Sequence, residues 1–181
     1  GGLQVRRVQA LVDEVWSPDD PLWLSNINSA TQLVVSGTRK ALDRARCASN
    51  AALASTFDVL DVAVASHCPV QEATAAALVA ELASIPRRPL SGGYITNTGG
   101  RRTTDADTVL NDLALSVARP VRWYDATRLL PELGVTCAVQ VPPGGVLVTL
   151  LARNVPSVHS ISLTEAGIQT TVRRVRQHCY Q

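Results

Sequence analysis

Apolar residues recur at helical spacing at the beginning of the chain. Val5, Val8, Leu11, Val12 and Val15 are separated by three or four positions, which predicts a helix over 5–15. The proline-rich and acidic segment 17–21 that follows is typical of a turn.

Two short apolar segments, 22–27 and 32–35, predict a pair of strands joined as a hairpin. Thr38 then suits the N-cap of a helix that runs to about Leu53. Alternation over 59–65 predicts a further strand. The order helix, strand, strand, helix, strand is most of a split βαβ unit, so we expect a small ferredoxin-like α+β subdomain over 1–64 whose first strand would precede Gly1.

The rest of the chain alternates between helical and strand patterns. We expect helices over 70–85, 104–118, 123–133, 146–153 and 168–176, and strands over 94–97, 136–141 and 159–163. Such alternation favours a parallel α/β sheet. The predicted fold class is therefore α/β, with the α+β subdomain inserted before an α/β region over 65–181.

Composition narrows the class of protein. The chain has 181 residues, of which 46% are hydrophobic, so an intrinsically disordered chain is excluded and a sizeable core is expected. No apolar run is long enough to span a membrane. The chain begins with Gly1 and contains no methionine, so we expect it to be processed or to be a piece of a longer protein.

Charge and cysteine usage exclude further classes. A net charge of +2 with scattered arginine pairs does not form a nucleic-acid footprint; the pairs are either solvated or contact phosphate or carboxylate groups. The four cysteines form no C-x-x-C pair, so we expect reduced thiols at Cys47, Cys68, Cys137 and Cys179 of a cytoplasmic protein, and no metal site. No signal peptide is visible.

One histidine stands out among candidate catalytic residues. His67 follows the predicted strand 59–65 and precedes Cys68-Pro69, which places it where ligands bind in α/β folds. It is either a catalytic residue or a hydrogen-bonded structural histidine. No Gly-x-Ser-x-Gly, Walker A, dinucleotide fingerprint or H-E-x-x-H motif is present.

Several collinear motifs carry a resemblance to a known family. They are the histidine segment 65–70, the asparagine-rich segment Asn26–Gly37, the strand 94–97, the Arg119-Pro120-Val121-Arg122-Trp123 turn and the turn at 141–147. In this order they resemble malonyl-CoA:acyl-carrier-protein transacylases. Among these relatives, the residues of the motifs are most similar to the epsilon (transacylase) subunit of malonate decarboxylase. The resemblance implies the C-terminal part of such an enzyme: the small subdomain without its first strand, then the later part of an α/β-hydrolase-like acyltransferase domain.

The resemblance also implies a mechanism and residue roles. Malonyl would pass from malonyl-CoA to a serine and then to the phosphopantetheine-type thiol of an acyl-carrier protein, with no bound cofactor or metal. His67 would be the general base, oriented by the backbone carbonyl of Ser116, while Asn28, Ser66 and Asn97 would contact substrate. The serine nucleophile, the carboxylate-binding arginine and the oxyanion segment of the family have no counterpart here.

Three hypotheses follow. The first is an acyltransferase portion that supplies His67, is inactive alone, and has an acyl-carrier protein and other malonate decarboxylase subunits as partners, without nucleic acid or membrane. The second is a non-catalytic scaffold whose arginine pairs dock an acidic carrier protein. The third is a related serine hydrolase.

Overall fold

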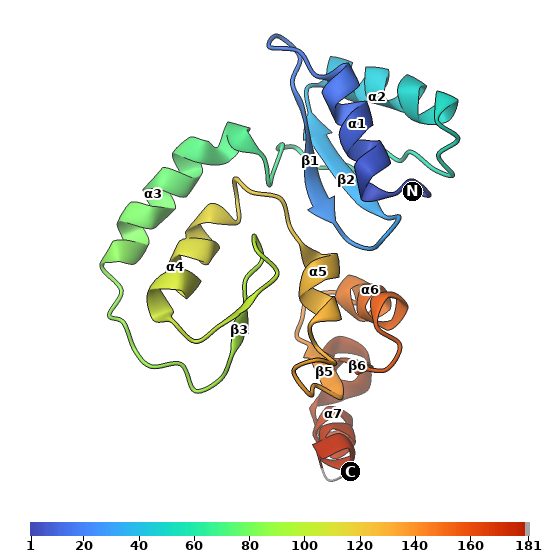
Figure 1. The fold of residues 1–181 in the computed structure, drawn as a ribbon. Helices are drawn as coiled ribbons and strands as arrows, with labels where there is room; N and C mark the ends of the chain where they lie inside the picture. The colour runs from blue at the N-terminus through green and yellow to red at the C-terminus, as the bar shows by residue number, and fades with distance from the viewer. Residues whose placement is uncertain (180–181) are drawn as a thin grey trace. The chain divides into compact units, whose positions relative to one another are not determined.

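Two helices and a β-hairpin form the first part of the structure, a computed structural model that describes residues 1–179. The elements are α1 (Val5–Val15), β1 (Leu22–Ile27), β2 (Leu33–Gly37) and α2 (Arg39–Ala51) (Figure 1). β1 and β2 are antiparallel. The helices pack with the hairpin around a core made of Leu11, Val12, Val15, Leu22, Ala41 and Ala45.

Local signals in this part are confirmed. The apolar stripe of α1 is the face that is buried, as its spacing predicts. Thr38 is the N-cap of α2, where its side-chain oxygen accepts a hydrogen bond from the backbone N–H of Ala41 at 3.1 Å. Thr38 also donates its hydroxyl to Asp20, so the cap is itself held in place.

The strand predicted over 59–65 is absent, and that prediction is wrong. The backbone N–H of Val62 donates to the carbonyl of Leu60 at 2.9 Å, a tight turn that breaks an extended chain. No described strand pairs with this segment. The apolar residues of this segment are 58–64% exposed: Val59, Leu60, Val62 and Val64. The alternating segment therefore has neither a neighbouring strand to pair with nor a core in which to bury one face. His67 therefore does not follow a strand end.

A helix pair and a small hairpin come next. The single 3₁₀ turn η1 (Pro69–Gln71) leads into α3 (Glu72–Ala83), which packs against α4 (Ala106–Leu115). Asp105 caps α4 by accepting from the backbone N–H of Thr108 at 2.8 Å. Between the two helices, β3 (Tyr94–Ile95) and β4 (Arg102–Thr103) pair in antiparallel fashion.

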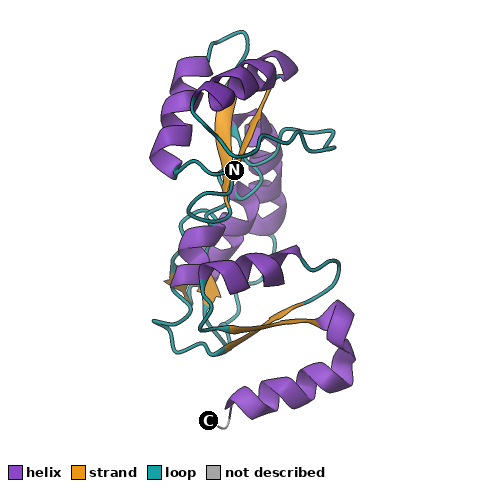
Figure 2. Cartoon of the chain, turned by 90° about the vertical axis from the view of Figure 1, so that its right-hand side faces the viewer, coloured by secondary structure: helices purple, strands orange, loops and turns teal. Residues whose placement is uncertain are grey.

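The last part contains the only parallel strand pair of the described residues. α5 (Trp123–Arg128) is shorter than expected and is followed by β5 (Cys137–Gln140), α6 (Val146–Asn154), β6 (His159–Ser162) and α7 (Leu163–Cys179). β5 and β6 are parallel, as predicted for this region. Gly167 interrupts α7 with a φ of 72°, a backbone conformation that glycine adopts readily (Figure 2).

The chain is a mixed α/β protein, as its pattern predicts, but only β5 and β6 form the expected parallel arrangement. By contacts it divides into two compact units, one over Gly1–Trp123 and one from Tyr124 onward. The predicted subdomains, 1–64 and 65–181, are a division by family architecture and stay a prediction. All five predicted site residues belong to the first unit.

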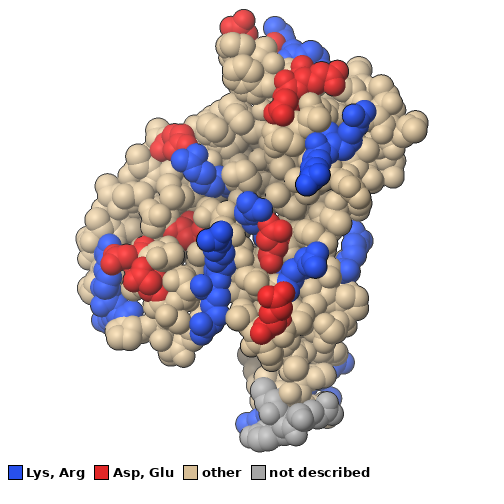
Figure 3. All heavy atoms as spheres, viewed as in Figure 1, with Lys and Arg blue, Asp and Glu red and all other residues tan. Residues whose placement is uncertain are grey.

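The described surface carries charged side chains of both signs (Figure 3). On the face shown in Figure 3, basic and acidic side chains are interspersed. Arg87 of one arginine pair donates to Asp107 at 2.7 Å. Cys47, Cys68 and Cys137 are not joined in disulfides, and the side chain of Cys179 lies outside the described ones. No helix among the described residues is long and apolar enough to cross a membrane.

Candidate functional site

The backbone of His67 is held in an unusual conformation. Its φ is 58°, in the left-handed region that residues other than glycine seldom adopt. Its N–H donates to the carbonyl of Val117 at 2.7 Å, just beyond the carboxyl end of α4. A strained residue that the surrounding structure holds in place is typical of functional sites.

The residues before His67 are fixed to two other elements. The hydroxyl of Ser36 in β2 donates to the carbonyl of Ser66 at 3.1 Å. The side chain of Gln71, at the end of η1, donates to the carbonyl of Ala65 at 2.9 Å. These hydrogen bonds position His67 without a strand, because side chains from flanking elements satisfy the loop carbonyls.

The His67 ring lies against the last turn of α4. Its Nδ1 is 2.6 Å from the carbonyl oxygen of Ser116, the C-cap residue of that helix. A carbonyl can only accept, so the neutral ring carries its proton on Nδ1 and presents Nε2 as an acceptor. Among residues 1–179 no hydrogen bond to Nε2 is found. The ring is therefore arranged to take a proton from a group outside these contacts.

The partner of the His67 ring is a backbone carbonyl at the end of a helix. The carboxyl end of a helix carries partial negative charge on its unpaired carbonyls. Addition of a proton at Nε2 leaves the Nδ1–H bond to the Ser116 carbonyl in place. The Ser116 carbonyl thus contacts the same ring nitrogen that a carboxylate contacts in a Ser-His-Asp triad.

Asn97 lies next to Ser116, and its predicted contact with substrate stays a prediction. Its side-chain amide donates to the hydroxyl of Ser116 at 3.2 Å, and its own carbonyl accepts from the backbone N–H of Arg122 at 2.9 Å. His67, Ser116 and Asn97 are therefore linked by consecutive hydrogen bonds, although they are far apart in the sequence.

Asn28 and Ser66 are placed near the same framework by backbone contacts. Asn28 closes the β1–β2 turn by donating its N–H to Gln32 at 3.0 Å. The end of β1 is bonded to Val121, which accepts from Ile27 and donates to Ser25. Ser66 directly precedes His67 and is partly buried. The roles of both residues toward substrate stay predictions.

The sequence did not single out two polar residues beneath this site. Asp112 is buried in α4, and Tyr94 donates its hydroxyl to the Asp112 carboxylate at 2.7 Å. Burial raises the pKa of Asp112, but hydrogen bonds from Thr98, Asn97 and Tyr94 outweigh it and leave the pKa lowered. Burial, and then the bond and charge of Asp112, raise the pKa of Tyr94. The sequence offered one signal that could have identified Asp112: it is an acidic residue in an otherwise apolar helical turn, four positions before Ser116.

No cluster of three or more metal-ligating side chains occurs among the described residues. The groups that the structure brings together are one imidazole, one amide, hydroxyls and backbone carbonyls. Such a set can move a proton and orient a polar substrate.

Comparison with curated proteins finds transacylases. The chain is 32% identical over 140 residues to the malonyl CoA-acyl carrier protein transacylase of Salmonella typhimurium, which covers 77% of this chain and 45% of that protein. The enzyme of the same name from Escherichia coli strain K12 is 31% identical over the same shares. The chain thus spans about half the length of the curated relatives it matches. No protein-family model matches the sequence.

Solved structures show the same likeness. An acyl carrier protein S-malonyltransferase from Vibrio cholerae superposes with a TM-score of 0.83 at 25% identity, over 89% of this chain and 52% of that one. A type II PKS acyl-carrier protein in complex with its malonyl-transacylase gives a TM-score of 0.82 at 27% identity, with the same shares. The chain is therefore homologous to part of these transacylases, which confirms the resemblance carried by the motifs.

Proposed function

We propose that this chain supplies the general base of an acyltransferase that moves malonyl from malonyl-CoA to the thiol of an acyl-carrier protein. The observation that carries the proposal is the His67 ring, whose Nδ1 is fixed by the Ser116 carbonyl at 2.6 Å while Nε2 is left as an acceptor. Relatives named as malonyl CoA-acyl carrier protein transacylases support the choice of reaction.

The mechanism is a two-step exchange through a serine ester. In the first step, Nε2 of His67 takes the serine proton as the oxygen attacks the malonyl thioester, and the imidazolium returns that proton to the departing CoA thiolate. In the second step, Nε2 takes the proton of the carrier thiol, whose sulfur attacks the ester, and the proton returns to the serine. Both steps use the same Nδ1–H anchor.

The serine comes from a segment that matches the part of the relatives not spanned here. We base this on the absence, among residues 1–179, of any hydroxyl or thiol bonded to Nε2. The chain alone would then be inactive in transfer. No resident cofactor or metal is needed, because acid–base and nucleophilic steps complete the reaction. The 1–64 subdomain and the 65–181 region would be parts of one acyltransferase.

Asn28, Ser66 and Asn97 would contact the acyl group or the pantetheine arm. Asn97 is the best supported of the three, since its amide already contacts Ser116 beside the base. The acyl-carrier protein is the proposed partner, as in the solved complex of a related transacylase. The cytoplasm is the proposed location, where cysteines that are not joined in disulfides, such as Cys47 and Cys68, are the rule.

A narrower assignment is the epsilon (transacylase) subunit of malonate decarboxylase, which would add the other decarboxylase subunits as partners. This assignment rests on which residues occur in the motifs around His67 and Arg119-Pro120-Val121. Measuring transfer to the decarboxylase carrier and to the fatty-acid carrier, side by side, tests it. A preference for the decarboxylase carrier supports the assignment, and a preference for the other contradicts it.

The proposed function is tested with His67→Ala in the complete enzyme, scored by transfer of labelled malonyl from malonyl-CoA to the carrier. His159→Ala is the matched control, because His159 is an exposed histidine stacked on His178 in the second unit. We expect loss of transfer by about 10²–10⁴-fold for the first variant and little change for the second.

Transfer near the parent rate in His67→Ala would refute the proposal. Absence of transfer in the parent, with binding to the carrier retained, would favour the scaffold hypothesis. Hydrolysis of simple esters without any need for carrier would favour the serine hydrolase.

A further inference from the structure

One charged side chain is buried in the first unit. Asp112 in α4 is 3% exposed and is the only acidic or basic residue among the described buried ones. None of the ion pairs between described residues involves it. A buried carboxylate without a cation is strongly unfavourable unless hydrogen bonds satisfy it.

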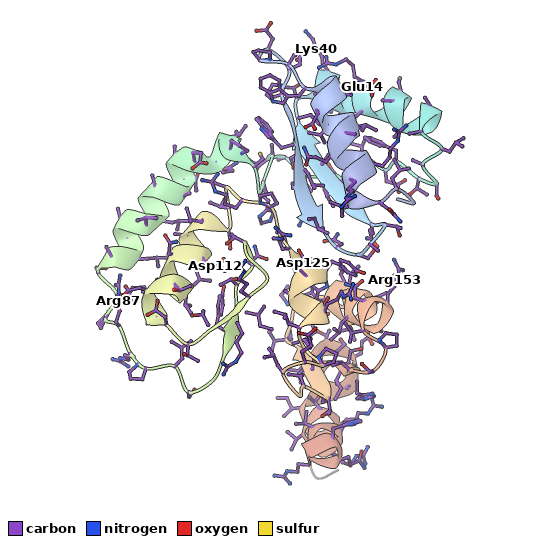
Figure 4. The ribbon with its side chains drawn as sticks, viewed as in Figure 1. Glu14, Lys40, Arg87, Asp112, Asp125 and Arg153 are labelled. Carbon is purple, nitrogen blue, oxygen red and sulfur yellow. The ribbon has the colours of Figure 1, made fainter. Side chains whose placement is uncertain are left out.

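Four hydrogen bonds satisfy this carboxylate, and all come from one short segment. The donors are the Tyr94 hydroxyl at 2.7 Å, the Asn97 N–H at 2.8 Å, the Thr98 N–H at 3.0 Å and the Thr98 hydroxyl at 2.5 Å. Figure 4 labels Asp112 on α4 beside the β3 segment. The buried charge therefore ties β3 and the turn after it to α4.

The same α4 turn carries the carbonyl that orients His67. The backbone carbonyl of Asp112 accepts both the N–H of Ser116, at 2.9 Å, and its hydroxyl, at 2.7 Å. The Ser116 hydroxyl in turn accepts a hydrogen bond from the side-chain amide of Asn97. The backbone N–H of Asn97 donates to the Asp112 carboxylate. Asp112, Asn97 and Ser116 thus form a closed ring of hydrogen bonds, one step from His67.

We propose that Asp112 is a positioning residue for His67: its carboxylate fixes Asn97 against Ser116, and this fixes the carbonyl that holds the His67 ring. The inference rests on the proposed function of His67 as the base. Loss of the carboxylate frees the turn 96–98, removes the amide support from the Ser116 hydroxyl, and lets the carboxyl end of α4 shift or fray. His67 then loses its preference for the Nδ1–H tautomer.

The variant that tests this is Asp112→Asn, which keeps the size of the side chain but offers one acceptor oxygen where the carboxylate offers two. The matched control is Asp105→Asn, which makes the same change on the same helix. Asp105 caps the other end of α4, and its carboxylate accepts hydrogen bonds only from the N–H and the hydroxyl of Thr108. It therefore makes the same chemical change on α4 at a position where Asn also serves as an N-cap, without touching Asn97 or Ser116.

The first readout is the protonation site of the His67 ring, measured by ¹⁵N NMR on the 181-residue chain. We expect a slowly exchanging Nδ1–H in the parent and in Asp105→Asn. In Asp112→Asn we expect a mixture of the two tautomers and exchange at least about tenfold faster. An unchanged Nδ1–H signal and exchange rate in folded Asp112→Asn would overturn the inference.

Tyr94→Phe keeps the proposal testable if Asp112→Asn does not fold. It removes a single donor from the carboxylate and keeps the ring that packs beside it. We expect a smaller change in the same direction. If exchange at His67 matches the parent in folded Tyr94→Phe and folded Thr98→Val, the ring of hydrogen bonds does not control His67.

The second readout is malonyl transfer by the complete enzyme. Asp112→Asn should lower kcat by about 10- to 100-fold because the base is misplaced, and any rise in KM should be smaller, because of the proposed substrate contacts only Asn97 is released. A higher KM at unchanged kcat would overturn the positioning role. The NMR readout does not depend on transfer, so failure of the inference and failure of His67 as base are distinguished.

Discussion

The left-handed backbone of His67 predicts an unusual order of stability for two substitutions. His67→Ala and His67→Gly both remove the ring and its hydrogen bond to Ser116. This loss lowers the free energy of unfolding by about 1 kcal/mol in each variant. Both keep the N–H that donates to Val117 at 2.7 Å. The two variants therefore differ in how well the new residue tolerates a φ of 58° and in the conformational entropy that it loses on folding.

The expected difference can be worked out from that angle. An L-residue in the left-handed region is disfavoured by about 1–2 kcal/mol, and glycine avoids this. Glycine loses about 0.5–1 kcal/mol more conformational entropy on folding than alanine. His67→Gly should therefore be more stable than His67→Ala by about 0.5–1 kcal/mol, the reverse of the order at an ordinary position.

Urea unfolding followed by tryptophan fluorescence measures this difference. The three tryptophans, Trp16, Trp23 and Trp123, all lie in the first unit, so their emission reports on the part that holds His67. We expect the midpoint of His67→Gly to exceed that of His67→Ala by a few tenths molar, roughly, for an ordinary m-value.

The neighbouring pair Ser66→Ala and Ser66→Gly is the control, because Ser66 is not among the positive-φ residues. There alanine should be the more stable. If alanine is also the more stable at position 67, the His67 backbone is not strained in solution and the reasoning is refuted.

Three further predictions concern stability. Leu53 follows α2 with a φ of 58° and a Schellman pair of hydrogen bonds, so Leu53→Gly should raise the unfolding free energy by about 0.5–1 kcal/mol; a decrease would contradict this. Thr38→Ala removes the α2 cap and should lower the unfolding free energy by about 1 kcal/mol in the same urea assay, and no change would argue against the cap. The pKa of Asp112 is lowered on folding, so its contribution is present above the unfolded value of about 3.9 and is lost as pH falls through the folded value. The gap in unfolding free energy between the parent and Asp112→Asn should therefore be constant from pH 7 to 5 and shrink below about pH 4, and a gap that widens there would contradict the assignment.

Local signals in the sequence predicted the elements that depend on local interactions. The spacing of Val8, Leu11 and Val15 predicted α1, and Thr38 predicted the start of α2. Both predictions succeeded because an apolar stripe and an N-cap depend on residues only a few positions apart. The strand over 59–65 failed because a strand also needs a partner, which alternation cannot supply. The predicted strand over 94–97 contains β3, but its antiparallel partner β4 was missed, because a strand of two residues leaves no pattern in the sequence.

The candidate site was predicted in part through the family resemblance. It named His67 and the Ser116 carbonyl, and the structure brings their atoms to 2.6 Å. His67 was singled out from the sequence because a strand was expected to end just before it, and that reason was wrong. The segment is held instead by the carboxyl end of α4 and by Ser36. Asp112 was missed because its partners, Tyr94 and Thr98, lie across a loop whose path the sequence does not reveal.

The central claim is that His67 takes the proton in acyl transfer, and single-turnover release of CoA tests it most directly. Complete enzyme carrying His67→Gln is mixed with excess malonyl-CoA, without carrier protein, and CoA release is followed with a thiol reagent. The account predicts a first turnover slower by about 10²–10⁴-fold than in the parent. A first turnover at the parent rate would contradict it.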